Sequence, residues 1–285
     1  MNCDPAAVAR ALRLAGVTVN HLELVRKALR TGLKDPIAGL WVHAGPRSLA
    51  PEFAHERAVA GAASGCITPQ AHLIFDGPWV YSPWRYVAPR DSARPADLAG
   101  ALATFHSTKP SPEIISRPSR LVTFSAAAFK AAPLEPNISA QLISRLTASA
   151  ALLAANPGPL GTGLVHGDAH LGNVLVGETV LLCDLENAGW GARVLDLAPL
   201  YVEHRRYGKS MEPFYELVAA YETPTGDPWD PWADPAFVPA VELTEMFLAA
   251  WSLSEAESGD QAATLETQRR VTSLLGTSLT PWTRR

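Results

Sequence analysis

Hydrophobic and polar positions alternate most clearly over residues 164–186, near the middle of the chain. A pair of apolar residues precedes a polar loop at residues 166–173, and two short apolar runs then follow, separated by a Gly-containing turn. Short runs of β-branched residues and Leu around such a turn predict a buried β-hairpin. The polar residues gather in the loop and directly after the last strand: they are His166, Asp168, His170, Asn173, Asp184 and Glu186. Carboxylates and an amide beside a dry hairpin are costly unless they are partnered, so they predict a ligand site.

The first third of the chain predicts a small sheet with accompanying helices. Asp4-Pro5 before an apolar segment predicts a helix over residues 6–15. Extended segments at residues 21–29 and 37–43 follow, joined by a turn-rich stretch at residues 30–36. The elements expected next are a helix over residues 48–63 and short strands over residues 71–75 and 79–82.

The remainder of the chain is predominantly helical in pattern. Leu98, Leu102 and Phe105 recur at helical spacing and predict a helix over residues 95–106. Residues 107–120 are rich in Pro and Ser and predict a surface loop, and Gly189-Trp190-Gly191 predicts another. The other expected helices span residues 139–155, 211–221, 239–253 and 260–275.

Composition and charge exclude several classes of protein. At 285 residues with 47% hydrophobic residues, the chain is long enough for a substantial core. A net charge of −4 gives no electrostatic reason to expect a nucleic acid or a membrane surface as a partner. Cys3, Cys66 and Cys183 form no C-x-x-C pair, so reduced thiols are expected rather than disulfides or zinc. The N-terminus lacks a leader pattern and no apolar run approaches about 20 residues, which favours a cytoplasmic protein.

The spacing of the central polar residues suits phosphoryl transfer. Asp168 is followed five positions later by Asn173, and Asp184 ends the next hairpin. In such chemistry one carboxylate orients the attacking hydroxyl, while an amide oxygen and a second carboxylate hold Mg²⁺ against the nucleotide phosphates. A metallohydrolase site on His166-x-Asp168-x-His170 is an alternative. It leaves Asn173 and Asp184 unexplained, and the remaining histidines are scattered.

The segment His166-Gly167-Asp168-Ala169-His170-Leu171-Gly172-Asn173, followed by Asp184-Leu185-Glu186, resembles the aminoglycoside phosphotransferase and choline kinase-like family. Every defined position of that family's H-G-D-x-H-x-x-N and D-x-E or D-x-D pattern is present, and Asp196-Leu197-Ala198 matches its usual continuation. The resemblance implies a protein-kinase-like α+β fold of two lobes. We therefore expect a small β-containing N-lobe over residues 1–87 and a larger, mainly helical C-lobe over residues 88–285.

The resemblance also implies a role for each central residue. Asp168 is the expected catalytic base, and His166 is expected to brace its loop. Asn173 and Asp184 are the expected Mg²⁺ ligands. His170 is either a loop support or an acceptor contact, Glu186 assists the metal or the substrate, and Asp196 supports the loop from beneath.

The nucleotide side of the predicted site departs from the family's usual pattern. A kinase-like enzyme pairs a strand Lys or Arg with a helix Glu, and Glu56 suits the helix position. The strand before it contains neither Lys nor Arg, so either Lys27 or Lys34 substitutes, His43 serves as a weaker donor, or the nucleotide is held differently. Residues 82–89 occupy the position of the hinge that meets adenine. Its candidate contacts are Trp84, Tyr86 and Val87, although a Pro-bounded connector with two core aromatics fits this segment equally well.

These patterns together predict an enzyme that moves the γ-phosphate of ATP or GTP to a hydroxyl of a small molecule, with Mg²⁺ as cofactor. Residues 201–260 contain twelve Asp and Glu but only three Lys and Arg. Such an excess is commonly just a solvated surface, but it favours a cationic acceptor such as an amino sugar, an aminoglycoside-like antibiotic or an amino alcohol. A second class of function is a degenerate kinase-like regulator that binds a nucleotide or small molecule. Because the chain retains both Asp168 and Asp184, the active enzyme is favoured.

Overall fold

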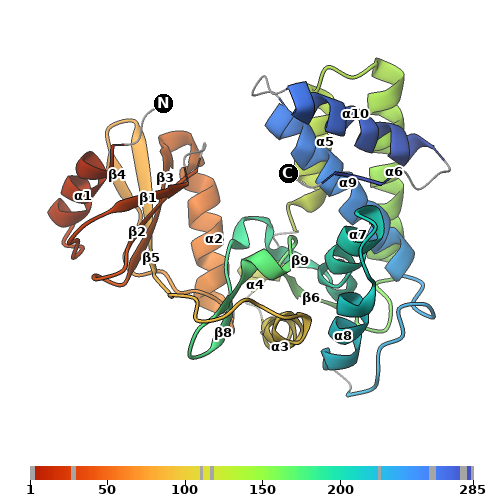
Figure 1. Ribbon diagram of the computed structural model, residues 1–285, viewed down its shortest axis with the longest axis horizontal. Helices are drawn as coiled ribbons and strands as arrows, with labels where there is room; N and C mark the ends of the chain where they lie inside the picture. The colour runs from red at the N-terminus through yellow and green to blue at the C-terminus, as the bar shows by residue number, and fades with distance from the viewer. Residues whose placement is uncertain are drawn as a thin grey trace. The chain divides into compact units, whose positions relative to one another are not determined.

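The structure, a computed structural model, describes residues 4–26, 30–109, 112–115, 119–223, 226–256, 261–276 and 281–283. The chain forms two compact units (Figure 1). Unit 1 comprises residues 1–93 and 174–186, and unit 2 comprises residues 94–173 and 187–285. The division expected at Val87 lies close to the first crossing between the units. The segment Val174–Glu186, which the sequence placed in the second part, instead folds with unit 1.

Unit 1 is built on a five-stranded antiparallel sheet with strand order β1-β2-β3-β5-β4. Its strands are β1 (Glu23–Arg26), β2 (Thr31–Asp35), β3 (Leu40–Pro46), β4 (Ile74–Asp76) and β5 (Trp79–Arg85). Two helices, α1 (Pro5–Leu14) and α2 (Ala50–Ala62), flank the sheet in Figure 1.

Side-chain alternation along the strands explains why the sheet is covered on both faces. Leu40, Val42 and Ala44 of β3 point to one face and pack with Val8 and Leu12 of α1. On the other face, Val80 of β5 packs with Phe53 of α2. The sheet therefore has a buried core on each side.

The strand β2 overturns part of the sequence prediction. Residues 30–36 were expected to be a turn because Gly, Pro and polar residues dominate them, yet Thr31–Asp35 is a strand that pairs with both β1 and β3. Leu33 is fully buried at its centre, and Asp35 accepts backbone hydrogen bonds from Asn20 and His21. The prediction of a turn was wrong because burial of one Leu and satisfaction of one carboxylate outweigh a composition typical of loops.

The predicted central hairpin forms. Strand β7 (Val174–Val176) pairs with β8 (Val180–Leu182) in the register Val174↔Leu182. A parallel bridge joins Cys66 to Leu182, and an antiparallel bridge joins Asp91 to Val176, so the hairpin is attached to the rest of unit 1.

Unit 2 is mainly helical, as expected. The helices are α3 (Pro95–His106), α4 (Pro112–Ile115), α5 (Leu121–Ala131), α6 (Pro136–Ala155), α7 (Ala198–Arg206), α8 (Glu212–Ala220), α9 (Phe237–Ala256) and α10 (Gln261–Leu275). Helix α9 is the central one, because α5, α6, α7 and α10 all pack against it. A two-stranded ribbon joins β6 (Thr162–Val165) to β9 (Gly189–Ala192). The prediction of a loop at residues 189–191 was therefore wrong, since these glycines lie in a strand and Gly191 approaches Val165 closely.

One described helix, α6, has the length and composition that would allow it to cross a membrane. The core helix of a globular unit passes the same test, and α6 contributes Leu142, Leu146 and Leu153 to the core of unit 2. Its contacts with α5 and α9 account for these apolar residues.

Candidate active site

The loop of residues 166–173 begins directly after β6, within unit 2. Gly167 has a φ of 79°, and a Cβ atom at this position would lie 2.5 Å from the Asn187 carbonyl oxygen and 2.9 Å from Ser119 Oγ. A residue with a side chain therefore meets both backbone strain and a steric clash here. The loop passes tightly between neighbouring segments, which fixes its path from the first residues.

Asp196, at the end of a short 3₁₀ turn over Arg193–Asp196, holds the start of this loop. Its carboxylate accepts hydrogen bonds from the backbone N–H groups of His166 (2.6 Å) and Gly167 (2.8 Å). His106 Nε2 lies 2.9 Å from the same carboxylate. Because Asp196 is 1% exposed and serves three donors, it has the contacts of a buried structural support.

The hydrogen-bond network continues beyond Asp196 to a third residue. His106 Nδ1 is 2.6 Å from the Tyr221 hydroxyl, so the arrangement that satisfies both ring nitrogens has Nε2 donating to Asp196 and Tyr221 donating to Nδ1. Burial raises the pKa of Tyr221, and the nearby Asp196 charge raises it further. Tyr221 therefore remains a neutral donor. We call Tyr221, His106 and Asp196 the support network.

The predicted catalytic residues lie in the loop above this network. Asp168 is partly exposed, and its backbone carbonyl accepts a hydrogen bond of 2.9 Å from Asn173 Nδ2. His166 is fully buried, with its Nδ1 3.3 Å from the Asp168 backbone nitrogen. His170 Nδ1 accepts from the Gly172 backbone N–H at 3.0 Å. Both histidine rings are thus used within the loop, which favours loop support over acceptor contact for His170.

Asp184 and Glu186 belong to unit 1, directly after β8. Asp184 has a φ of 63° and is the only non-Gly residue with positive φ in the described part of the chain. Such a conformation is costly for Asp and often accompanies a functional position. Both carboxylates face the same cation, Arg30: its Nη1 is 3.7 Å from Asp184 Oδ1 and also forms an ion pair with Glu186 Oε2.

Arg30 also reaches Glu56, the helix residue predicted to pair with a phosphate-binding cation. Arg30 Nη2 is 3.5 Å from Glu56 Oε2, and His43 Nδ1 is 3.8 Å from the same oxygen. Burial raises the pKa of the Glu56 carboxyl, but His43 and Arg30 outweigh it and the net pKa is lowered. Burial raises the pKa of Glu186, with Asp184 and Glu56 adding to the effect. Glu56 is therefore the ionised partner of Arg30.

Sequence reasoning missed Arg30 because this residue fell in the stretch expected to be a turn. Of the candidates named instead, Lys34 lies 3.2 Å from Glu23 on the neighbouring strand, and Lys27 lies outside the described residues. Recognising β2 was the missing signal, since Thr31 pairs with Ala44 and Arg30 immediately precedes it. That register brings the start of β2 to the part of β3 that carries His43.

A cavity of about 500 Å³ lies at the end of β5, wholly within unit 1. Its lining residues are Arg85, Tyr86, Val87, Ala88, Arg90, Gly177, Glu178, Thr179 and Leu181. Residues 82–89 were predicted to be either a hinge that meets adenine or a connector with two core aromatics, and the structure supports a different one of these for different residues. Tyr86 and Val87 line the cavity, whereas Trp84 is a fully buried strand residue among the core aromatics, its ring 6.4 Å from that of His43.

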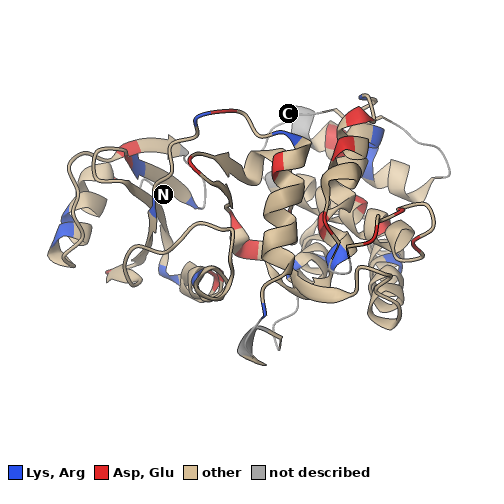
Figure 2. Cartoon of the chain, turned by 90° about the horizontal axis from the view of Figure 1, so that it is seen from below, with Lys and Arg blue, Asp and Glu red and all other residues tan. Residues whose placement is uncertain are grey.

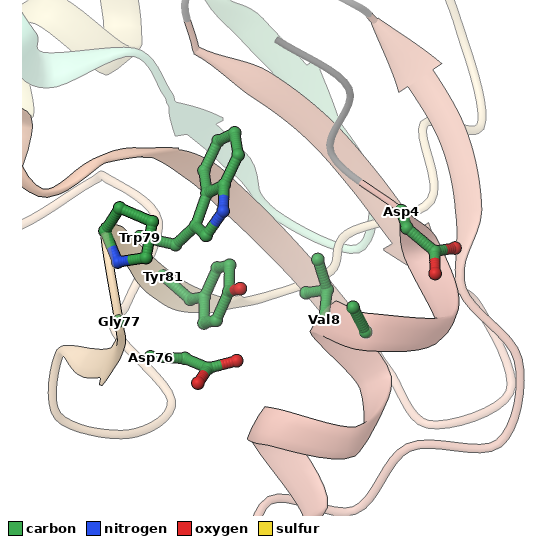
Figure 3. Close-up of a pocket in the computed structure, with 8 residues that line it drawn as sticks. Asp4, Val8, Asp76, Gly77, Trp79 and Tyr81 are labelled. Carbon is green, nitrogen blue, oxygen red and sulfur yellow. The ribbon is translucent and has the colours of Figure 1, made fainter.

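A second cavity of about 230 Å³ lies between α1 and the turn joining β4 to β5 (Figure 3). Trp79 and Tyr81 extend toward it from β5, and Asp4 and Asp76 are at its rim. Asp4 caps α1, because its carboxylate accepts from the Ala6 backbone N–H at 3.0 Å. This cavity contains none of the residues predicted for the site.

Comparisons with known proteins identify the family of this chain and the fold that it shares with solved structures. The sequence matches the profile of the phosphotransferase enzyme family over residues 42–233. The chain belongs to this family. No curated protein matches the chain.

Solved structures show the fold that this phosphotransferase-family member shares. A choline/ethanolamine kinase family protein from Mesorhizobium loti is 20% identical, with a TM-score of 0.63 over 96% of this chain and 94% of that one. An ethanolamine kinase from Plasmodium vivax is 15% identical, with a TM-score of 0.65 over 93% and 86%. An aminoglycoside phosphotransferase from Streptomyces rimosus is 17% identical, with a TM-score of 0.60 over 85% and 99%. The prediction of a protein-kinase-like α+β fold is confirmed.

The acidic region of this phosphotransferase-family chain is partly used inside unit 2. Glu245 forms a buried, two-pronged ion pair with Arg206 at 2.6 and 2.7 Å. Asp234 accepts from the Trp229 indole N–H and the Ala236 backbone N–H, both at 2.8 Å. These carboxylates are structural, so they do not face an acceptor.

The remaining acids of the region divide further. Glu242 accepts from Ser149 Oγ at 2.6 Å, and Glu203 pairs with Lys209 at 2.8 Å. Among the side chains of this region that the structure describes, the exposed carboxylates are Glu212, Glu216, Glu222, Asp227 and Asp230. Figure 2 shows basic residues interspersed with acidic ones along the chain. The net acidity that remains available to a ligand is thus smaller than the sequence count indicates.

The donor set in unit 1 fits a divalent cation. Asp184 and Glu186 offer hard carboxylate oxygens, the ligands that Mg²⁺ prefers, and both already converge on one positive group. Within the described residues, no group of three or more His, Cys, Asp or Glu side chains forms a metal cluster. The His166, Asp168 and His170 triplet of the metallohydrolase alternative is therefore not such a cluster, and both of its rings are bonded within the loop.

Proposed function

We propose that this protein is a Mg²⁺-dependent phosphotransferase that moves the γ-phosphate of ATP or GTP to a hydroxyl of a small molecule. The observation that carries the proposal is the Asp168 loop. Its complete H-G-D-x-H-x-x-N sequence starts from two backbone N–H groups held by the buried Asp196. A loop positioned so firmly can present one partly exposed carboxylate in a fixed place, as general base chemistry requires.

The proposed roles follow from the contacts inside the loop and from the chemistry of its side chains. Asp168 uses its backbone carbonyl to bind Asn173 Nδ2, and its carboxylate accepts and orients the acceptor hydroxyl. Asn173 then has its carbonyl oxygen Oδ1 as the ligating atom. Asp184 and that oxygen would be the metal ligands, and Glu186 would assist. When bound, the metal would supply positive charge beside the phosphates, and the residues above would hold it.

The nucleotide base is proposed to occupy the cavity at the end of β5. Its volume of about 500 Å³ lies within the range of about 300–1,000 Å³ typical of small-molecule sites. Val87, Ala88 and Leu181 supply apolar side chains to its lining. Solved neighbours in this fold were crystallised with ADP or AMP-PNP, which supports a nucleotide here.

The acceptor is proposed to be a small alcohol that carries positive charge. Among the structural neighbours are proteins bound to streptomycin, spectinomycin and hygromycin B, and an ethanolamine kinase. All of these point to amino sugars and amino alcohols as the first compounds to test, with an antibiotic-modifying activity as one outcome. The exposed carboxylates of α8 and the following segment supply charge of the matching sign. We propose that the enzyme acts in the cytoplasm and that its partners include neither a nucleic acid nor a membrane.

The test combines nucleotide binding with turnover. We expect ATP or GTP to raise the melting temperature of the protein in a Mg²⁺-dependent way, since a ligand that binds the native state stabilises it by mass action. Production of ADP or GDP is then measured across a panel of aminoglycosides, amino sugars and amino alcohols. Asp168→Asn should lower kcat about 100- to 10,000-fold, as loss of a catalytic base does, while nucleotide affinity stays within about twofold.

The outcomes separate the two candidate functions. A nucleotide-dependent shift in melting temperature with no turnover in either protein would favour the regulator that binds without catalysis. Equal turnover by the wild type and Asp168→Asn would contradict the assignment of the base.

A further inference from the structure

Arg30 is an unusually situated cation, and the proposed function does not yet use it. Its side chain is 17% exposed and contacts three carboxylates, those of Glu56, Asp184 and Glu186. The guanidinium carbon also lies 5.0 Å from the centre of the Phe53 ring, in a cation–π contact. The residue is therefore held inside unit 1 rather than extended into solvent.

We infer that Arg30 is the cation that binds the phosphates of the nucleotide, and that it exchanges Asp184 and Glu186 for those phosphates when a divalent cation takes the two carboxylates. This inference rests on the proposed function. Arg30, which directly precedes β2, would then bind the phosphates in place of a Lys or Arg on β3.

Charge balance is the first argument. Three carboxylates surround one guanidinium, so with all groups ionised the cluster carries a net charge of −2, from −3 and +1. A divalent cation supplies the missing charge, and its ligands would be the oxygens that Arg30 now shares.

The second argument is that the two terminal nitrogens of Arg30 contact different carboxylates. Nη2 pairs with Glu56 at 3.5 Å, while Nη1 alone serves Asp184 and Glu186. Loss of the Nη1 contacts therefore leaves the Glu56 pair in place, and Glu56 is fully buried on α2 and stays ionised. Arg30 can release the metal ligands without losing its anchor.

Unused hydrogen-bonding capacity is the third argument. Arg30 Nε is buried and has no hydrogen-bond partner in the described residues. A buried donor without a partner costs free energy, and once the two carboxylates are taken by a metal, Nε and Nη1 each offer an N–H to a phosphate oxygen, from different edges of the guanidinium. Among the other described candidates, Lys34 is occupied by Glu23, and His43 offers a single ring nitrogen to Glu56.

The experiment compares the wild type with Arg30→Gln, Arg30→Lys and the matched control Lys34→Gln, which removes a cation from the same strand region of unit 1. The first measurement is Mn²⁺ affinity without nucleotide, by electron paramagnetic resonance of the free ion. Arg30→Gln should bind Mn²⁺ about tenfold more tightly than the wild type, because a unit charge a few Å away is removed from the carboxylates. Lys34→Gln should match the wild type. Equal Mn²⁺ affinity in Arg30→Gln and the wild type would overturn the inference.

The second measurement is calorimetric binding of ATP and of adenosine, each with Mg²⁺. Arg30→Gln should weaken ATP binding about tenfold or more and leave adenosine binding unchanged, while Arg30→Lys should lie between Arg30→Gln and the wild type. A parallel loss for ATP and adenosine would show that Arg30 supports the fold of the lobe and would overturn the inference. If Arg30→Gln does not fold, Arg30→Lys carries the same comparisons with smaller shifts.

The failure of the two proposals can be told apart. A wild-type protein that binds neither ATP nor adenosine contradicts the proposed function. In that case the Mn²⁺ comparison still decides whether Arg30 and a divalent cation compete for Asp184 and Glu186.

Discussion

Replacement of Asp196 by Asn tests whether the support network fixes the catalytic loop. Asp196 Oδ2 accepts from the His166 backbone and from His106, and Oδ1 accepts from the Gly167 backbone. Asn has one acceptor oxygen where Asp has two, and its NH₂ group must face one of these donors. At least one buried hydrogen bond is lost, and the others lose the assistance of the charge. Hydrogen bonds to charged groups are worth about 1.5–3 kcal/mol each and neutral ones about 1, so the substitution should cost about 2–4 kcal/mol.

That loss is large but compatible with folding, since domains are stable by about 5–15 kcal/mol. The assay is urea unfolding at 25 °C, followed by tryptophan fluorescence and circular dichroism, with the variant compared at the transition that includes unit 2. Asp227→Asn is the matched control, because Asp227 is exposed and its replacement should change the free energy of unfolding by less than about 0.5 kcal/mol. A second readout is kcat, which should fall while the KM for the nucleotide changes little. An Asp196→Asn protein as stable as the control would refute the assigned role of the network.

Two further predictions concern single positions. Gly167→Ala should destabilise the protein by about 1–3 kcal/mol and lower kcat, because the added Cβ meets the Asn187 carbonyl at 2.5 Å in a left-handed conformation; an unfolding midpoint and kcat like those of the wild type would contradict this. Burial of Asp35 acts to raise its pKa, but backbone N–H groups of Ala38, His21 and Asn20 outweigh it and lower the pKa. The stabilisation by this carboxylate should therefore be complete above its ordinary pKa near 4 and be lost as the pH falls through the lower folded value. Unfolding free energies of the wild type and Asp35→Asn should converge in that acidic range, and a constant difference down to pH 3 would count against it.

Local patterns were sufficient where one element decides its own structure. The helix over residues 95–106 was predicted with the bounds it has, because Leu98, Leu102 and Phe105 repeat at helical spacing and are all fully buried. The hairpin of β7 and β8 was likewise evident, since its turn and its apolar runs are adjacent in sequence.

Long-range pairing explains what the sequence did not reveal. β2 and β9 contain glycines and few apolar residues, and each is a strand only because a partner elsewhere in the chain satisfies its backbone. The motif residues of the candidate site were predicted from their spacing and from the family resemblance. Arg30 was not, because its partners Asp184 and Glu186 lie more than 150 positions away. His106, which belongs to no motif, was missed for the same reason, because it lies 90 positions from its partner Asp196.

The membership of Val174–Glu186 in unit 1 has a consequence for synthesis of the protein. The sheet of unit 1 is complete once residue 93 has left the ribosome, but the hairpin that belongs to it ends at residue 186. Until then the backbone of Gly65 and Ile67 lacks its partner Leu182, whose N–H and carbonyl bond to them at 2.8 and 2.9 Å. At about 5–20 residues per second, the intervening 93 residues (186 − 93) take roughly 5–19 s to appear. During that interval the nascent unit 1 exposes an unpaired edge. Helices α3, α5 and α6 of unit 2 are synthesised before unit 1 can finish folding.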